Sequence, residues 1–176
     1  MESRYWKEIL QKTASELDRQ KKPKPLTQRR CELTERDVIL GFFVIRKLVE
    51  LSRVSKLTVD FEFNVFSCPF TGRSMSPIDR HGIEKSYSLD NESAVSKKML
   101  YVANQFIHSS LLLITVDETR NWDSFYVVSD YDKKRFIWRI PVQQIAKAFK
   151  VASKDYLESF KYEYDKKHDE YGIIPD

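Results

Sequence analysis

The chain has 176 residues, of which 41% are apolar and 32% are charged, and its formal net charge is +4. This length and composition predict one soluble globular domain whose core needs no disulfide or metal. The longest uncharged apolar run spans only Val38–Ile45. Because about 20 apolar residues are needed to cross a bilayer, we expect no membrane segment. The first residues lack the apolar block of a secretory signal, so we expect no signal peptide either.

The two cysteines, Cys31 and Cys68, occur without a CxxC pair. This usage predicts free thiols and a reducing, cytoplasmic setting, with a Cys31–Cys68 disulfide as the alternative. No paired Cys and His spacing is present, so we expect neither a zinc site nor another cofactor.

The positive charge excess lies in one short segment, residues 19–30. The segment holds six basic residues and no acid, which leaves the other 164 residues with a net charge of −2. Six cations on an extended, proline-containing backbone can neutralise phosphates and release counterions, so the expected partner is nucleic acid or an acidic protein. The alternative is a solvated linker. The candidate contact residues are Arg19, Lys21, Lys22, Lys24, Arg29 and Arg30.

The first third of the chain predicts two helices. Apolar residues at helical spacing predict an N-terminal helix that ends at residue 18, and a basic, proline-containing connector follows over residues 19–33. Thr34-Glu-Arg-Asp37 resembles a capping box, which predicts a largely buried helix through Leu51. Gly41 in its middle predicts that another backbone packs closely there.

The middle of the chain predicts a sheet interrupted by one helix. Strict alternation over residues 57–65 predicts a half-buried strand, and a loop over 67–82 and a short strand near 83–89 follow. Val95, Met99, Val102 and Phe106 recur at helical spacing, which predicts a helix entered near residues 90–93. Leu111–Val116 is apolar on both faces and predicts a central strand.

The last third predicts a hairpin, a helix and a terminal hairpin. Strands over 125–129 and 136–140 flank the charged tip 130–135, and Pro141 suits the start of a helix. Aromatic residues alternate with charge after residue 160 and predict a second hairpin, with a helix as the alternative.

These elements predict the α+β class, with a mainly antiparallel sheet of about five strands packed against three to four helices. We expect one domain over residues 1–176, made of an N-terminal helical arm (1–18), the connector and a main body (34–176). The arm either packs back on the body or moves freely. The terminal strand suits pairing between subunits as well as within one, so a homo-oligomer is a further expectation.

Asn104-Gln-Phe-Ile-His108 at the end of a predicted helix is the first candidate for catalysis. Residues i and i+4 share a helix face, so the amide and the imidazole can meet in one pocket. The stretch is similar to the motif of HEPN-type ribonucleases, in which a helical Arg precedes a polar residue, three others and a His. In this chain the Arg position holds Ala103, so the cation that stabilises phosphoryl-transfer charge is missing. The alternative is that Asn104 and His108 cap the helix end.

Asp117 and Asp132, with Lys134, form a second candidate. Their spacing is similar to the D…(D/E)-x-K pattern of restriction-like nucleases, in which two carboxylates hold a divalent metal and the Lys helps to activate water. That chemistry needs the second acid on a strand beside the first. The predicted hairpin instead puts Asp132 and Lys134 at a tip in solvent, and a hydrophilic turn is the alternative.

The loop over 67–82 is the expected recognition surface, because long loops between sheet elements often contact ligands. Cys68 at its start could pair with His81 or His108 as a thiolate and imidazolium, but a buried, inert thiol is the stronger expectation. Four charged or titratable residues form the candidate recognition set: Arg73, Asp79, Arg80 and His81.

Two classes of function follow from the sequence. The leading one is a non-catalytic binding or adaptor protein that contacts nucleic acid or a protein through the basic connector and the 67–82 loop. The absence of a phosphate loop, nucleophile elbow or metal motif favours it. The second is a nuclease-like enzyme that uses Asn104 and His108 without metal, or the acidic set with one.

Overall fold

The computed structural model describes residues 3–18, 25–73, 82–157, 160–165 and 170–175, the last two stretches by their backbone alone. The elements in chain order are α1 (Ser3–Leu17), α2 (Gln28–Glu50), α3 (Lys56–Val59), β1 (Glu62–Pro69), α4 (Ile83–Ser86), β2 (Ser93–Lys98), α5 (Met99–Ile107), β3 (Ser109–Val116), β4 (Trp122–Ser129), β5 (Phe136–Pro141), α6 (Val142–Lys154), β6 (Phe160–Asp165) and β7 (Glu170–Pro175).

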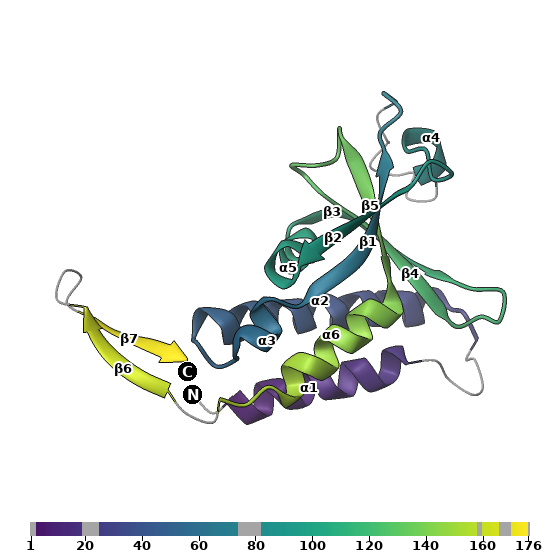
Figure 1. The fold of residues 1–176 in the computed structure, drawn as a ribbon. Coiled ribbons are helices and arrows are strands. Elements are labelled where there is room, and N and C mark those ends of the chain that lie inside the picture. The colour runs from purple at the N-terminus through teal and green to yellow at the C-terminus, as the bar shows by residue number, and fades with distance from the viewer. Residues whose placement is uncertain (1–2, 19–24, 74–81, 158–159, 166–169, 176) are drawn as a thin grey trace.

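Five of the strands form one antiparallel sheet in the order β2-β1-β5-β4-β3, and β6 pairs with β7 in a separate hairpin (Figure 1). The predicted α+β class and five-stranded antiparallel sheet are confirmed. The described residues contain six helices where three to four were expected, because two of the six, α3 and α4, are single turns.

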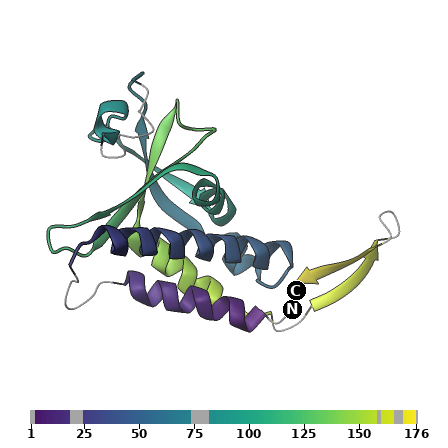
Figure 2. The same ribbon diagram turned by 180° about the vertical axis from the view of Figure 1, so that it is seen from behind.

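The long helices lie together on one side of the sheet. Helices α2, α5 and α6 pack against it, and α1 packs on α6 and α2 as the outermost helix (Figure 2). Leu10, Ala14 and Leu17 on α1 are buried in this contact. The N-terminal helix therefore belongs to the body, which answers the question that the sequence left open.

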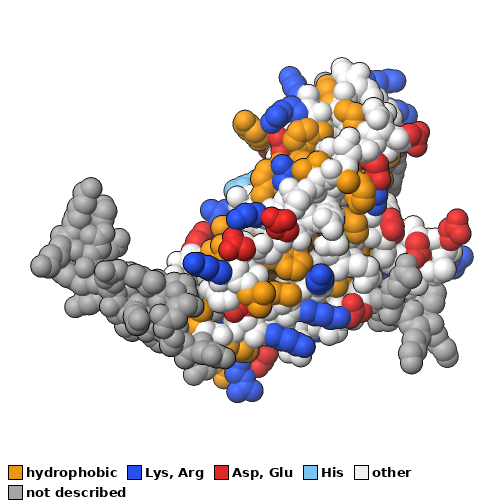
Figure 3. Space-filling model, in the orientation of Figure 1, with side chains coloured by type: hydrophobic (Ala, Val, Ile, Leu, Met, Phe, Trp, Pro, Cys, Tyr) orange, Lys and Arg blue, Asp and Glu red, His pale blue; other side chains and the backbone are white. Residues whose placement is uncertain are grey.

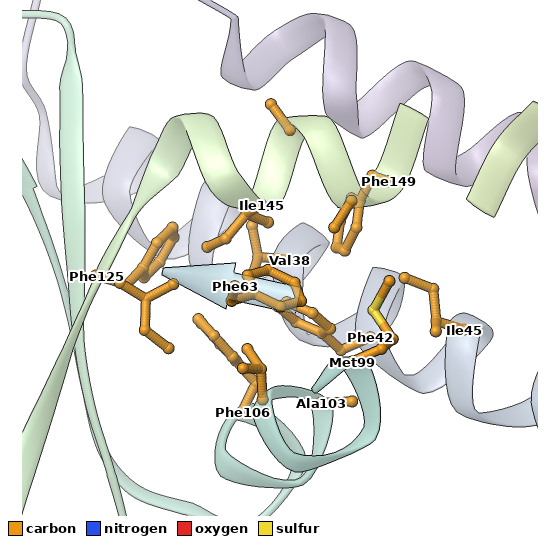
Figure 4. Packing of buried hydrophobic residues seen from close by; sticks show 14 of the residues in the cluster. Val38, Phe42, Ile45, Phe63, Met99, Ala103, Phe106, Phe125, Ile145 and Phe149 are labelled. Carbon is orange, nitrogen blue, oxygen red and sulfur yellow. The ribbon is translucent and has the colours of Figure 1, made fainter. Parts of the chain in front are cut away.

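The main core lies between the sheet and these helices, and aromatic rings dominate it (Figure 4). The ring centroids of Phe42 and Phe106 are 4.6 Å apart, and those of Phe42 and Phe149 are 5.0 Å apart. A Cβ atom on Gly41 would lie 2.3 Å from Cε2 of Phe149. Gly41 is thus required for a close approach, as predicted, but the neighbour is a side chain rather than a backbone.

A second, smaller cluster covers the opposite face of the sheet beside α4. Its buried members are Cys68, Ile83, Tyr87, Leu111, Val128 and Ile137. This cluster explains why β3 is apolar on both faces, because each face of the strand meets a core. The prediction of a central strand is wrong: β3 forms one edge of the sheet.

Helix α2 begins six residues earlier than the predicted start at Thr34. The Thr27 Oγ1 atom accepts a hydrogen bond from the Arg30 N–H at 3.2 Å and caps the helix, so the first helical residue is Gln28 rather than one near Thr34. The predicted connector over 19–33 is therefore wrong from residue 28 onward, and Arg29 lies with Arg30 in the first turn of α2. Residues 19–24 lie outside the described part of the chain.

The alternating segment 57–65 is the clearest error of the sequence analysis. It splits into the helical turn α3 and the first residues of β1, which continues to Pro69. The Asp155 carboxylate holds the turn, accepting hydrogen bonds from the Ser55 N–H at 2.9 Å and the Thr58 hydroxyl at 2.5 Å. A contact from a residue about 100 positions away thus overrides the local alternation.

Two further elements differ from their predictions. Residues 83–86 form α4 rather than a strand, and the isolated Phe70–Tyr87 bridge follows it next to the end of β1. The helix expected from residues 90–93 is a strand as far as Lys98, because Val95 pairs with Val65 on β1. Helix α5 starts at the next residue.

The hairpin of β4 and β5, the helix after Pro141 and the terminal hairpin of β6 and β7 are confirmed. Helix α5 is joined to its neighbours without loops: it starts directly after β2, and His108 alone separates it from β3. Within the described residues, no helix combines the length and apolar character needed to cross a membrane.

Candidate functional site

A groove of about 960 Å³ lies between α5 and the turn that joins β4 to β5. Residues from α5, all five strands of the sheet and the turn line it: Ser67, Val95, Lys97, Tyr101, Asn104, Gln105, His108, Ser109, Ser129, Asp130, Tyr131, Asp132, Arg135, Phe136 and Trp138. Two other hollows, one between α2 and β3 and one near the start of β4, are smaller, at about 410 and 380 Å³. The groove contains several residues that the sequence singled out.

Four aromatic residues lie along the groove. Alternation in β5 puts Phe136 and Trp138 on the same face, with ring centroids 4.6 Å apart. Tyr101 of α5 meets the Trp138 ring edge to face at 5.7 Å. Trp138 is buried, Tyr101 and Phe136 are partly exposed, and Tyr131 on the turn is 82% exposed. The groove therefore offers three accessible rings above a buried indole.

Two cations lie over these rings. The Lys97 Nζ atom is 4.6 Å from the Tyr101 ring centroid and 5.3 Å from that of Trp138. The Arg135 guanidinium is 5.2 Å from the Phe136 centroid and 5.9 Å from that of Tyr131. Such cation–π contacts hold the charges at the groove surface, where an anionic ligand can reach them.

Asp132 lies at the floor of the groove and is only 2% exposed, so the expectation of a solvent-facing hairpin tip is wrong for this residue. Its carboxylate accepts hydrogen bonds from the Gln105 amide at 3.1 Å and the Tyr101 hydroxyl at 3.3 Å. Arg135 donates to the second carboxylate oxygen at 3.4 Å. The side-chain oxygen of Gln105 is buried without a hydrogen-bond partner among the described residues.

Burial raises the pKa of Tyr101 to about 12, and the Asp132 carboxylate beside it acts in the same direction. The phenol therefore keeps its proton at neutral pH and acts as a donor. In this network Tyr101 and Asp132 bind one another rather than exchange a proton, which suits a positioned binding surface better than acid–base chemistry.

At the α2 end of the groove, Arg46 meets both residues of the first catalytic candidate. Its Nη1 atom donates to the Asn104 side-chain oxygen at 3.3 Å and lies 3.5 Å from His108 Nε2. Glu50 holds the same guanidinium through Nε at 2.9 Å. Position 103, where the HEPN-like pattern has its Arg, is a buried alanine. A cation from α2 thus stands beside the amide and the imidazole.

The structure does not bring the acidic set together. Asp117 lies in the turn before β4, where its carboxylate accepts hydrogen bonds from the Thr119 N–H and the Asn121 N–H at 2.9 and 3.0 Å. Asp132 follows the other end of β4, and Lys134 is exposed on the turn. Within the described ranges, no three His, Cys, Asp or Glu side chains are grouped to hold a metal ion.

Only two of the six basic residues of the segment 19–30 lie in the described part of the chain. The Arg30 guanidinium stacks over the Trp122 ring at 4.2 Å, and Arg29 is exposed beside it. Both border a hollow of about 380 Å³ near the start of β4, whereas the groove lies at the end of this strand. Arg19, Lys21, Lys22 and Lys24 lie outside the described residues. Figure 3 shows basic and acidic side chains interspersed on the visible face.

The 67–82 loop is described only in part. Arg73 is exposed, and Asp79, Arg80 and His81 lie outside the described residues. Cys68 is buried in the second cluster, and burial raises its pKa to about 11, so its thiol is protonated at neutral pH. Since the preceding residue, Ser67, lines the groove, Cys68 faces the opposite side of the sheet from His108.

Sequence reasoning missed four contributors to the groove: Lys97, Tyr101, Gln105 and Arg135. Lys97 was assigned to a helix, and Arg135 to a solvated turn. Tyr101 and Gln105 occupy i and i+4 of α5 and follow the same spacing as Asn104 and His108, so a search of that helix face could have found them. Comparison of the chain with family models, curated proteins and solved structures found no match, so the geometry carries the functional argument.

Proposed function

We propose that this chain is a non-catalytic module that binds single-stranded nucleic acid in the groove between α5 and the β4–β5 turn. The observation that carries the proposal is the set of accessible aromatic rings with cations above them. Lys97 lies over the Tyr101 ring. Arg135 lies over the rings of Phe136 and Tyr131. Every base has a face that can stack on such rings, with a contribution of about 1–3 kcal/mol per base. The cations attract the phosphates between the bases.

The charge balance of the groove also supports an anionic ligand. Asp130 is paired with Lys133 at 2.8 Å, and Asp132 is paired with Arg135 at 3.4 Å. Lys97 has no carboxylate partner among the described residues. The negative charges of Asp130 and Asp132 are therefore largely compensated by their basic partners, while Lys97 remains available to bind a phosphate.

The basic segment 19–30 supplies a second, sequence-independent contact in this proposal. Its described members, Arg29 and Arg30, are separated from the groove by the length of β4, about 25 Å for eight residues. A strand long enough to reach both regions would gain stacking at one and counterion release at the other. Both cysteines are free thiols, which supports the cytoplasm as the place of action.

Fluorescence anisotropy with labelled oligouridylate and oligothymidylate over a salt series tests the proposal. Tyr131→Ala should lower affinity about five- to hundredfold without a change in salt dependence, because it removes one stacking ring. Lys97→Gln should reduce the slope of log affinity against log salt by about 0.7. Changing the six basic residues of 19–30 to Gln should reduce that slope further and leave the Tyr131 effect intact.

Matched controls come from α1, on the far side of the helical layer. Tyr5 is exposed as Tyr131 is, and Lys12 is an exposed lysine, so Tyr5→Ala and Lys12→Gln should leave affinity unchanged. The proposal fails if neither oligonucleotide binds at low salt. It also fails if binding depends on the basic segment alone, and that outcome would leave the groove for a protein partner.

A metal-free nuclease is a second candidate function, and the position of Arg46 favours it. Its guanidinium lies beside Asn104 and His108 and could stabilise the charge that develops on a phosphate during strand cleavage. The imidazole would act as general acid or base. The metal-dependent version has weaker support, because Asp117 and Asp132 lie at opposite ends of β4.

Cleavage of labelled RNA in the presence of a chelator distinguishes the two functions. An enzyme of this kind should lose activity in His108→Ala and in Arg46→Gln but keep it in Asp132→Asn. If the wild-type chain binds RNA and leaves it intact with or without divalent metal, the nuclease is excluded and the non-catalytic binding function remains.

A further inference from the structure

The terminal hairpin of β6 and β7 makes no substantial contact with the other described elements of its own chain. Figures 1 and 2 show β6 and β7 standing clear of both the helices and the five-stranded sheet. Among the described elements, each of the two strands packs substantially only against the other. An isolated two-stranded hairpin is at best marginally stable in water, whereas three or more strands with an apolar face can be stable on their own. Pairing with further strands would therefore stabilise the hairpin.

The register of the hairpin separates its residues by type. Phe160 pairs with Pro175, Tyr162 with Ile173 and Tyr164 with Tyr171. Because alternate residues of a strand share a face, these six positions form one wholly apolar and aromatic face. Lys161, Glu163 and Asp165 occupy the other face of β6. The hairpin thus has the sequence pattern of a sheet with one covered side, although it consists of only two strands.

We propose that β6 pairs antiparallel with β6 of a second copy of this chain, about a two-fold axis through Tyr162. This register puts Lys161 opposite the second copy's Glu163, and by symmetry the same ion pair forms twice. Phe160 comes opposite the second copy's Tyr164 on the apolar face. Opposite charges and aromatic pairs directly across strands are both stabilising. The product is a four-stranded antiparallel sheet in the order β7-β6-β6-β7.

Self-pairing through β7 fits less well. A two-fold axis through Gly172 would bring Glu170 opposite the second copy's Ile174 and leave a glycine, which supplies no cross-strand contact, at the centre. The β6 edge is complementary to itself in both charge and aromatic pattern, so a second copy is the occupant that the sequence of this strand favours.

Sedimentation velocity of the full chain over a concentration series tests the pairing, with circular dichroism to confirm folding. The wild-type chain should show a concentration-dependent dimer. In the dimer, position 161 of each copy lies opposite position 163 of the other. Lys161→Glu therefore creates two Glu–Glu pairs and Glu163→Lys two Lys–Lys pairs, so each variant should weaken the dimer at least about tenfold. Within the hairpin these positions face Ile174 and Gly172, so neither change creates a like-charge pair directly across β7.

Two rescue experiments make the register specific. The double variant Lys161→Glu with Glu163→Lys should dimerise as the wild type does. A mixture of the two single variants should form a heterodimer in which both ion pairs are restored with reversed charge. Lys12→Glu on α1 is the matched control and should not affect dimerisation. A chain that stays monomeric at all attainable concentrations, or a dimer that tolerates Lys161→Glu, would overturn the proposal.

Discussion

Two buried charges, Lys7 on α1 and Asp132 at the floor of the groove, are satisfied in different ways. Lys7 on α1 is 1% exposed, and its ammonium donates to the backbone carbonyls of Arg53 and Asp155. Asp132 is nearly as buried, but its partners are side chains that line the groove, and the adjoining Gln105 oxygen has no hydrogen-bond partner among the described residues. The contacts of Lys7 join α1 to the residues that follow α2 and α6. The network around Asp132 leaves one buried acceptor without a partner in the described part of the chain and borders the groove.

The largest expected effect comes from Lys7→Ala. The change leaves two buried carbonyls without their donor and removes the cation that lies 4.0 Å from the Tyr156 ring centroid. We expect a loss of about 3 kcal/mol in the free energy of unfolding, measured by urea denaturation. Lys12→Ala on the exposed side of the same helix should change it by less than about 0.5 kcal/mol. Equal effects of the two substitutions would show that the hydrogen bonds of Lys7 do not stabilise the fold.

Asp132→Asn should affect stability less and ligand affinity more. The amide keeps some of the hydrogen bonds but loses the charge, so we expect a loss of about 1–2 kcal/mol. Nucleic-acid affinity at low salt should rise about fivefold, because Arg135 is released and a negative charge leaves the groove. Asp130→Asn, at an exposed position nearby, should not change stability. Unchanged affinity in Asp132→Asn would show that the ligand binds elsewhere.

Lys7 and Tyr101 should change the free energy of unfolding in opposite directions as the pH becomes alkaline. Burial lowers the pKa of Lys7 below its usual 10.5, so the unfolded chain binds more protons and stability rises as pH increases towards 10.5. The pKa of Tyr101 is raised from 10.0 to about 12, so the folded chain keeps a proton that the unfolded chain loses, and stability falls from pH 10 to 12. Urea denaturation across this range should show a shallower fall in Tyr101→Phe than in the wild type. Identical slopes would contradict the coupling of Tyr101 to folding.

The smallest effect is expected from Gln105→Met. The variant loses one hydrogen bond to Asp132 but also removes the buried oxygen that has no partner within the described ranges, and these two contributions oppose each other. We expect a net change below about 1 kcal/mol by thermal or urea denaturation. A much larger loss of stability would mean that the hydrogen bonds of Gln105 and Asp132 are as important for folding as those of Lys7. The two buried charges would then not differ in role.

The sequence predicted those elements whose signals are local. The N-terminal helix, the β4–β5 hairpin and the terminal hairpin follow from periodicity and turn residues within each segment. The errors arise where a distant residue decides the outcome. The turn α3 exists because Asp155 binds Ser55 and Thr58, and β2 is a strand because β1 pairs with it.

The candidate site was predictable only in fragments for the same reason. The spacing of Asn104 and His108 indicated a shared helix face, and both residues line the groove. No local pattern could reveal that Arg46, 58 positions before Asn104, supplies a guanidinium there, or that Asp132 folds inward beneath Tyr101. Charge counting also drew attention to the basic segment, whereas the groove combines paired acids with a few cations.

The loop-free attachment of α5 has a consequence for binding kinetics. Because β2 runs straight into this helix and His108 alone separates it from β3, Tyr101, Asn104 and Gln105 are fixed between two strands of the sheet. A surface held in this way has little conformational freedom to lose when a ligand arrives. Association should therefore proceed in a single phase at a rate set by diffusion and salt, and differences in affinity among ligands should lie in how fast they leave.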